Sequence, residues 1–418
     1  MENKLFQDVA TSETHPQWEE LITRNDSLYE RKDDARSPFS RDYTRILHSH
    51  AYRRLKHKTQ VFYNVDNDHI CTRMEHVAHV ESVSSTIAQA LGLNTELTKA
   101  IAIGHDLGHA PFGHHGEVVI QELIHEHIDP NERFWHERNG LKFVDEVELL
   151  EDSHRIYRNL SLTYAVRDGI ISHCGEVNEN GLRPREDRFD LNEFQIPGQY
   201  QPATWEGCVV KISDKIAYLG RDVEDAIRLG FLDDKAQDEL LKMARMNDHE
   251  VMNTTTIIYT LISDICRNSD PDKGICLSEP YLKMFDSVKD YNYRYIYKNK
   301  RFRPFENYSR LVIRELFDFL MDFYREETPG SIWENFEEAE KYYPTLLESF
   351  ESHLSKYCDD GVIPRRKEKL RAIALKCDNK KIYGRLDSRK EYARAIINFL
   401  SGMTDRFAIE AFEELIHF

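Results

Sequence analysis

The stretch EHVAHVESVSSTIAQALGLNTELTKAIAIGHDLGHAPFGHHGE, residues 75–117, sets the pattern for the whole chain. Its first part, up to Leu91, carries one apolar stripe at helical spacing, made of His76, Val80, Val83, Ile87 and Leu91. A stripe of this kind predicts an amphipathic helix, and Gly92 is typical of the residue that ends one. The side chain of His76 is therefore expected to face the core.

A second helix is expected directly afterwards, with its N-terminal cap at residues 94–95. Apolar steps of four residues lead along it to His105 and Asp106. Gly108 and Pro111 then interrupt the helical pattern. His105 and Asp106 are thus expected near the C-terminal end of this helix.

A third helix is predicted between Trp205 and Gly230. Its expected buried stripe consists of Ile212, Ile216, Leu219, Val223 and Ile227. An adjacent row holds Asp214, Tyr218 and Asp222 at steps of four, which places two carboxylates and a phenol along one helix edge.

The rest of the chain has the same 3.6-residue period and few alternating, strand-like runs, so the predicted fold class is all-α. Breaks in the pattern fall near Asn268 to Gly274, Thr328 to Ser331 and Asp359 to Pro364, and a polar excursion covers residues 176–203. We expect an N-terminal segment with a catalytic core over residues 1–235, and a C-terminal helical region over 236–418 packed on it as one compact unit.

Composition excludes several classes of protein. The chain has 418 residues, 40% of them hydrophobic, which is enough for a large core, and its formal net charge of -17 argues against a non-specific DNA binder. No apolar run approaches the roughly 20 residues of a membrane span, and residues 1–15 contain no apolar stretch typical of a signal peptide, so we expect neither. The seven scattered cysteines contain no CxxC pair and are expected to be free thiols, so we expect a cytoplasmic protein.

Thirteen of the nineteen histidines lie between His48 and His136. One histidine on an apolar helical face is more often a hydrogen-bonded core residue than a metal ligand. Inward-facing Asp106 and Asp214 change that assessment, because an unpaired buried carboxylate costs several kcal/mol. A shared divalent cation would explain both carboxylates and both inward histidines, and such a nitrogen and oxygen ligand set suits Mn, Mg, Fe, Co, Ni or Zn.

Four blocks of sequence resemble the HD-domain deoxynucleoside triphosphate triphosphohydrolases, in particular their bacterial deoxyguanosine-triphosphatase-like branch. The blocks are SRDYTRILHSHAYRRLKHKTQVF (40–62), NDHICTRMEHVAHV with HDLGHAPFGHHGE (67–80 and 105–117), LTYAVRDGIISHCGE (162–176) and VVKISDKIAYLGRDVEDAI (209–227). The resemblance implies an HD-domain helical core with C-terminal helical elaborations. It also implies hydrolysis of dNTPs, dGTP among them, to deoxynucleoside and inorganic triphosphate.

The same resemblance assigns roles to individual residues. The metal ligands that it implies are His76, His105, Asp106 and Asp214. The catalytic acid/base residues are His109, His114 and Glu117. The substrate-binding residues are Gln60, Arg73, His136, Lys215, Tyr218 and Asp222. Arg73, Lys215 and His136 would contact phosphates, since a triphosphate needs cations beside it. Tyr218 and Asp222 would lie along the deoxyribose, with Asp222 and Gln60 at the 3′-hydroxyl.

The family further implies Mn or Mg as the first choice of metal, a homo-oligomer of four or six chains, and in some members activation by a nucleotide. This sequence departs from the family at HERN, residues 136–139, where relatives commonly have His-Asn-x-Gln, so different side chains are expected to make the contacts there. Cys71 and His79 stand where Arg and Glu are frequent, and Ala110 where Pro is usual. None of these changes removes an expected ligand.

Two alternatives remain at this stage. One is an HD phosphohydrolase with another substrate, such as a nucleotidase or phosphodiesterase. The other is a non-catalytic nucleotide or single-strand DNA binder, for which the stretch YNYRYIYKNKRFRPF from Tyr291 to Phe305 offers interleaved aromatic and basic side chains. At helical spacing, such residues more often pack a helix against a neighbour.

Overall fold

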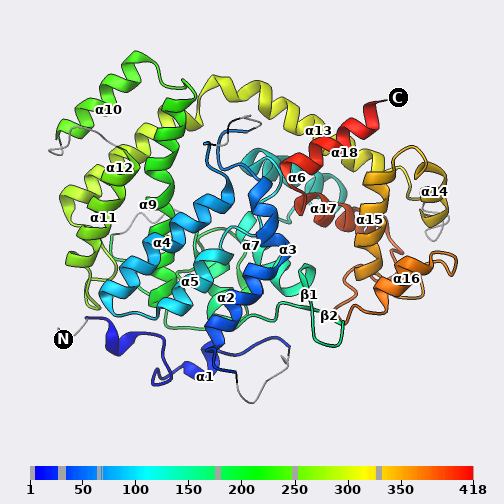
Figure 1. The fold of residues 1–418 in the computed structure, drawn as a ribbon, viewed down its shortest axis with the longest axis horizontal. Helices are drawn as coiled ribbons and strands as arrows, with labels where there is room; N and C mark the ends of the chain where they lie inside the picture. Colours follow the sequence, from blue (N-terminus) through cyan, green and yellow to red (C-terminus); the bar gives the residue numbers. More distant parts are fainter. Residues whose placement is uncertain are drawn as a thin grey trace. The chain divides into compact units, whose positions relative to one another are not determined.

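A computed structural model describes residues 5–26, 34–63, 67, 69–174, 180–246, 253–325 and 332–417. The described chain is mainly helical, which confirms the predicted fold class (Figure 1). The chain folds into two compact units: unit 1 is Met1–Leu47, Thr59–Asp106 and Ser161–Arg303, and unit 2 is His48–Lys58, Leu107–Leu160 and Pro304–Phe418. The division into domains expected after residue 235 stays a prediction.

Unit 1 is built around three helices that the sequence pattern predicts. Helix α4 packs against both α5 and α9 (Figure 1). Helix α8 also lies against α5 and α9. The helices of this unit are α1 (Trp18–Leu21), α2 (Pro38–His48), α4 (Arg73–Leu91), α5 (Thr95–Gly104), α8 (Tyr164–Ser172), α9 (Trp205–Arg228), α10 (Asp234–Met246), α11 (Thr254–Asn268) and α12 (Glu279–Asn292).

Local signals explain where these helices begin and end. Thr72 and Glu75 form a reciprocal capping box at the start of α4, and Gly92 ends that helix with a φ of 90°. Asn94 caps α5 through its side chain, as predicted. His76 is buried on α4, so its inward orientation is confirmed. The expected burial of Ile227 is wrong: its side chain is 47% exposed, because it lies in the last turn of α9.

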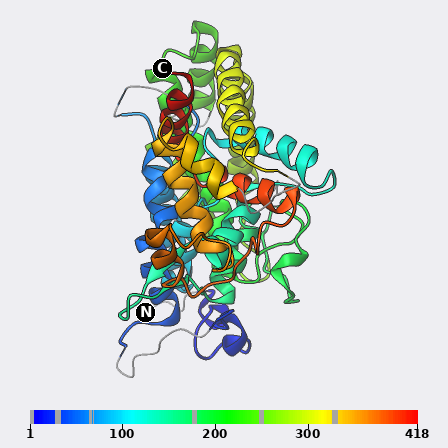
Figure 2. The ribbon, with the colours of Figure 1, turned by 90° about the vertical axis from the view of Figure 1, so that its right-hand side faces the viewer.

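Unit 2 carries the remaining helices and a short antiparallel hairpin that the sequence pattern did not predict. In Figures 1 and 2 helix α16 lies beside α15. The elements are α3 (His50–Arg54), α6 (Gly113–His127), α7 (His136–Lys142), β1 (Leu149–Glu151) paired with β2 (Tyr157–Asn159), α13 (Arg303–Met321), α14 (Ile332–Ala339), α15 (Pro344–Tyr357), α16 (Glu368–Ala374), α17 (Arg389–Ser401) and α18 (Asp405–Ile416).

The predicted breaks have mixed outcomes. Those near Asn268 to Gly274 and Asp359 to Pro364 are confirmed, since α11 ends at Asn268 and α15 at Tyr357. The break at Thr328 to Ser331 and the start of the polar excursion, residues 176–179, lie outside the described residues. No helix in the described part of the chain is long and apolar enough to cross a membrane.

Candidate metal centre and histidine cluster

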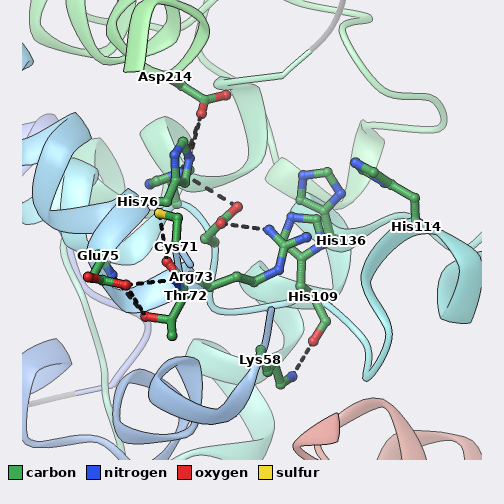
Figure 3. A network of polar contacts seen from close by, with 12 residues as sticks. Lys58, Cys71, Thr72, Arg73, Glu75, His76, His109, His114, His136 and Asp214 are labelled. Carbon is green, nitrogen blue, oxygen red and sulfur yellow. Dashed lines mark hydrogen bonds and ion pairs between the residues drawn. The ribbon is translucent and has the colours of Figure 1, made fainter. Parts of the chain in front are cut away.

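The metal ligands expected in unit 1 converge from three helices. His76 lies on α4, His105 caps the C-terminal end of α5, Asp106 follows it, and Asp214 lies on α9. His76, His105 and Asp106 are buried, and the ligand atoms of these three lie within 4.8 Å of one another. Asp214 joins the group through His76, whose Nε2 is 2.9 Å from Asp214 Oδ1 (Figure 3).

The contacts of His105 define which ring nitrogen faces this group. Its Nδ1 is 2.7 Å from the carbonyl oxygen of Ala102, so Nδ1 carries the proton and donates it. The lone pair of Nε2 is then directed at Asp106 Oδ1 and Asp214 Oδ1, which are 3.5 and 3.7 Å away. Among the described residues this buried Nε2 has no hydrogen-bond partner. Because a nitrogen lone pair facing two carboxylates needs a cation between them, the donor set fits a divalent metal.

The two aspartates are held in different ways. Burial alone would raise the pKa of Asp214, but the contacts with His76 and His105 outweigh it, and the pKa lies below its usual value. Asp106 accepts a hydrogen bond on Oδ2 from Arg73 Nη1 at 2.8 Å, while its Oδ1 faces His105. The structure thus places Arg73, expected at a phosphate, against a ligand carboxylate of the same cluster.

Sequence reasoning missed His173, which is buried at the C-terminal cap of α8. Its Nδ1 is 2.7 Å from the carbonyl oxygen of Ile170, the arrangement seen for His105, and the two ring centroids are 5.0 Å apart. His173, His105 and Asp214 have ligand atoms within 4.8 Å of one another. The usable signal was its position at the end of a helix, in the block LTYAVRDGIISHCGE.

Lys215 lines a cavity of about 170 Å³ within unit 1. Two further lysines, Lys211 and Lys289, line the same cavity, and Asp286 is the one carboxylate among its lining residues. Three cations against one anion favour a phosphate-bearing ligand. The family resemblance singled out only Lys215 of these three lysines; Lys211 lies one turn earlier on α9, and Lys289 comes from α12, which is distant along the chain.

The residues expected along the sugar also lie in unit 1. Asp222 is buried on α9 and accepts a hydrogen bond from the hydroxyl of Tyr297 at 2.5 Å, and burial raises the pKa of Asp222 to about 7. Tyr218, one turn earlier, is partly buried and packs on the core. Gln60 has a buried Oε1 with no hydrogen-bond partner among the described residues. Tyr297 was not singled out individually by sequence reasoning.

Unit 2 holds a second cluster, made of three imidazoles around one carboxylate. The rings of His109 and His136 stack, with centroids 3.7 Å apart and planes 15° apart. Glu117 Oε1 is 2.6 Å from His109 Nδ1, and Glu117 also lies 3.4 Å from Nδ1 of His136 and from Nδ1 of His114. Burial alone would raise the pKa of Glu117, but the neighbouring imidazoles outweigh it and hold the pKa well below the usual value.

The backbone explains why these side chains meet. A Cβ on Gly108 would lie 2.0 Å from the carbonyl oxygen of His136, so only glycine allows the two segments to approach this closely. Lys58 donates a hydrogen bond to the carbonyl oxygen of His109 (Figure 3). Phe112 adopts a φ of 63° immediately before α6, which then carries His114 and Glu117 one turn apart.

His114 differs from its neighbours because its side chain is 72% exposed. At residues 136–139, where the sequence departs from the family, Glu137 is fully buried, with one carboxylate oxygen 3.5 Å from His136 Nε2.

Cys71, another residue that departs from the family, is also buried, and burial raises the pKa of its thiol to about 12. Its backbone N–H donates to Asp225 at 3.0 Å, so Cys71 serves the local fold and is neutral.

The basic, aromatic stretch is largely occupied by contacts inside unit 1. Tyr291 is buried and donates to the carbonyl of Ala236, and Tyr295 and Arg294 both bond Glu239. Arg301 lies over the ring of Phe231, 4.0 Å from its centroid. These contacts favour the packing interpretation of residues 291–303 over a nucleic-acid surface.

Comparisons with known proteins agree with the geometry. A family model described as "HD domain" matches residues 73–219, which include all four expected ligands. A protein of Caldanaerobacter subterraneus subsp. tengcongensis is 30% identical over 94% of this chain and 89% of its own length. One of Desulfatibacillum aliphaticivorans is 35% identical over 69% of this chain and 74% of its own. Both bear the name deoxyguanosinetriphosphate triphosphohydrolase-like protein, as does one of Clostridium tetani, 30% identical over 80% of this chain and 87% of its own length.

Proposed function

The chain belongs to the HD-domain family of deoxyguanosinetriphosphate triphosphohydrolase-like proteins and is a phosphohydrolase, and from this premise we propose that it hydrolyses deoxynucleoside triphosphates, dGTP among them, to deoxynucleoside and inorganic triphosphate. The observation that carries the proposal is the buried lone pair of His105 Nε2, directed at two carboxylates. It supports a cation at the place where phosphate chemistry needs one.

His76, His105, Asp106 and Asp214 would hold the metal ion. When bound, a divalent cation would act as a Lewis acid on a phosphoryl oxygen, and Mn or Mg suits the two carboxylates best, although Fe, Co, Ni and Zn also accept this donor set. Arg73 bonds Asp106 in the structure and fixes the orientation of that carboxylate. These residues would therefore hold and orient the cation that makes the phosphorus easier to attack.

The reaction transfers the α-phosphorus from the 5′ oxygen of the deoxynucleoside to a water oxygen. The bond from water to phosphorus forms as the water gives up a proton to the imidazoles of the unit 2 cluster, the bond to the 5′ oxygen breaks, and that oxygen takes up a proton, so triphosphate stays intact as one product. In this proposal His114 delivers the proton, since it is the exposed imidazole of its cluster. Glu117 stays ionised and orients the rings of His109 and His114.

The family resemblance assigns both clusters to one reaction, and we propose the same for this chain. Lys215 with its neighbouring lysines would hold the phosphate tail together with Arg73 and His136. Asp222 and Gln60 would bond the 3′-hydroxyl, with Tyr218 against C2′.

Product analysis tests the proposal. The purified protein is incubated with each of the four dNTPs, separately and mixed, first with Mn and then with Mg. Deoxynucleoside and inorganic triphosphate in equal amounts are expected. Orthophosphate or a nucleoside monophosphate as the product would instead identify another HD phosphohydrolase, and no product in any mixture would contradict an enzyme acting on dNTPs.

The family resemblance also leads us to propose a cytoplasmic homo-oligomer, a tetramer or hexamer, in nucleotide pool control, with a nucleotide activator as a further partner. Turnover that occurs only in dNTP mixtures would reveal such activation. Sedimentation velocity measures the assembly, and a monomeric protein at micromolar concentration would contradict that part of the proposal.

A further inference from the structure

Unit 2 contains a cavity of about 560 Å³ that the proposed reaction does not use. Its walls come from α3, the segment after α7 with β1 and β2, α15, the end of α16 and the residues after it, α17, and the start of α18 with the loop before it. All of these lie within this unit. The volume falls in the range of small-molecule sites, roughly 300 to 1,000 Å³. None of the residues expected in catalysis, metal binding or substrate binding is among those that line it.

The charges around this cavity are predominantly positive. Arg54, Lys356 and Lys376 line it, and Glu148 is the one carboxylate among its lining residues, which leaves a formal charge of +2 with neutral histidines. Glu148 is already engaged, because Arg54 pairs with it and the backbone N–H of Ala51 donates to it at 2.9 Å. The two lysines have no ion-pair partner among the described residues. In a chain of net charge -17, such a concentration of cations favours an anionic ligand.

The remaining wall is mostly aromatic. The rings are those of Phe143, Tyr157, Tyr357, Phe399 and Phe407. Tyr357 donates its hydroxyl hydrogen to the carbonyl of Val147, so this ring presents an apolar face. Aromatic walls of this kind pack against a flat ring.

Neutral polar groups complete the lining. Burial and the nearby cations Lys356 and Arg54 lower the pKa of His353 to about 3, so its ring carries no charge. His353 Nε2 is 2.8 Å from the hydroxyl of Tyr383, which also accepts a hydrogen bond from Asn398 at 3.0 Å. This network is satisfied within the protein and fixes the wall of the cavity.

From this arrangement we infer that the unit 2 cavity binds a small phosphorylated molecule that carries a planar aromatic ring, with Lys356 and Lys376 on the phosphate and Phe399 and Phe407 against the ring. The lysines can reach such a phosphate at little cost to the fold, because Lys356 is half-buried and Lys376 is exposed. The backbone of Lys376 is fixed by the N–H of Tyr157, which donates to its carbonyl oxygen at 2.8 Å. The inference is independent of the proposed dNTP reaction.

Calorimetric titration with three probes tests this inference: phenyl phosphate, inorganic phosphate and phenol. A chelator is present throughout, so that the proposed metal centre contributes neither binding nor hydrolysis. We expect phenyl phosphate to bind with one site per chain and to bind at least about tenfold more tightly than inorganic phosphate or phenol, because each of those lacks one half of the recognition. Raising the salt concentration should weaken its binding.

The matched variants are Lys356→Met with Lys376→Met, and Lys390→Met as a control on an exposed lysine of α17 that does not line the cavity. The double variant should lose about tenfold or more in affinity for phenyl phosphate, whereas the control should not change. Unchanged affinity in a double variant that still unfolds cooperatively would overturn the inference. So would equal affinities for phenyl phosphate and phenol, or for phenyl phosphate and inorganic phosphate.

Discussion

The imidazoles of unit 1 and those of unit 2 are held in different ways. In unit 1, His105 and His173 direct Nδ1 at a backbone carbonyl three residues back, which leaves Nε2 as a lone pair beside carboxylates. In unit 2, the Nδ1 atoms of His109, His114 and His136 all lie within 3.4 Å of a single carboxylate, that of Glu117.

This difference separates two tasks of the same side chain. A backbone carbonyl accepts a hydrogen bond but does not take the proton, so it locks the tautomer that a metal ligand needs. A carboxylate shared by three rings leaves the proton on the rings exchangeable, which suits proton transfer. We therefore expect changes to the unit 1 metal ligands to act on metal content, and changes to the unit 2 imidazoles to act on rate alone.

The largest effect is expected from Asp106→Ala, which removes a carboxylate from the unit 1 cluster together with the hydrogen bond that it accepts from buried Arg73. Loss of the Lewis acid removes several kcal/mol of transition-state stabilisation, so dNTP turnover should fall by about 10³-fold or more. Metal content measured by mass spectrometry should fall in parallel. A variant that keeps both its metal and its activity would falsify the ligand assignment.

His114→Ala should cost less and should act differently. The protein should keep its metal, while kcat falls by about 10²- to 10⁴-fold, the range for a lost acid or base. His125→Ala is the matched control, since His125 is an exposed histidine in the last turn of the same helix, α6. If metal content dropped in His114→Ala, the contrast between the two clusters would be broken.

Gly108→Ala probes the backbone that assembles the unit 2 cluster. Its new Cβ would meet the His136 carbonyl and the Gly140 amide at 2.0 and 2.1 Å, so the free energy of unfolding should drop by about 1 to 3 kcal/mol. Gly361→Ala is the control, because a Cβ there meets nothing within 4 Å. Thermal denaturation compares the two, and equal unfolding temperatures would show that the segments can separate without cost.

The sequence predicts the unit 1 cluster better than the rest of the site. His76, His105 and Asp106 lie on or just after helices whose apolar period fixes which side chains turn inward, and Asp214 lies beside such a stripe. Periodicity carries this information because each of these positions is set by its own helix. The same logic failed for Ile227, where the helix ends and the stripe no longer faces a neighbour.

Contacts between distant segments could not be predicted in this way. The approach of Gly108 to His136 joins the loop after α5 to the start of α7, and the pairing of Tyr297 with Asp222 joins residues 75 positions apart. His173 was missed because a single histidine at a helix end gives no periodic signal. The hairpin β1–β2 was missed because its strands have three residues each, too few for an alternating pattern.

The smallest effect is expected from Tyr297→Phe, which removes the hydroxyl that donates to Asp222. Burial raises the pKa of Asp222 to about 7 and the Tyr297 hydrogen bond lowers it, so the variant should titrate at a higher pH. If ionised Asp222 accepts the 3′-hydroxyl of the substrate, KM should rise as pH falls through about 7 in the parent protein. In Tyr297→Phe that rise should begin at a higher pH, with a KM change of about fivefold near neutrality, as a lost hydrogen bond of about 1 kcal/mol predicts.

The pH profile of KM measures this shift. The value of kcat at high pH serves as the control, because the hydroxyl of Tyr297 bonds Asp222 and not a histidine of either cluster. At high pH Asp222 is ionised in both proteins, so kcat should coincide there even where the KM profiles differ. A KM profile that coincides with that of the parent would remove Asp222 from the sugar contacts and leave it a buried core carboxylate.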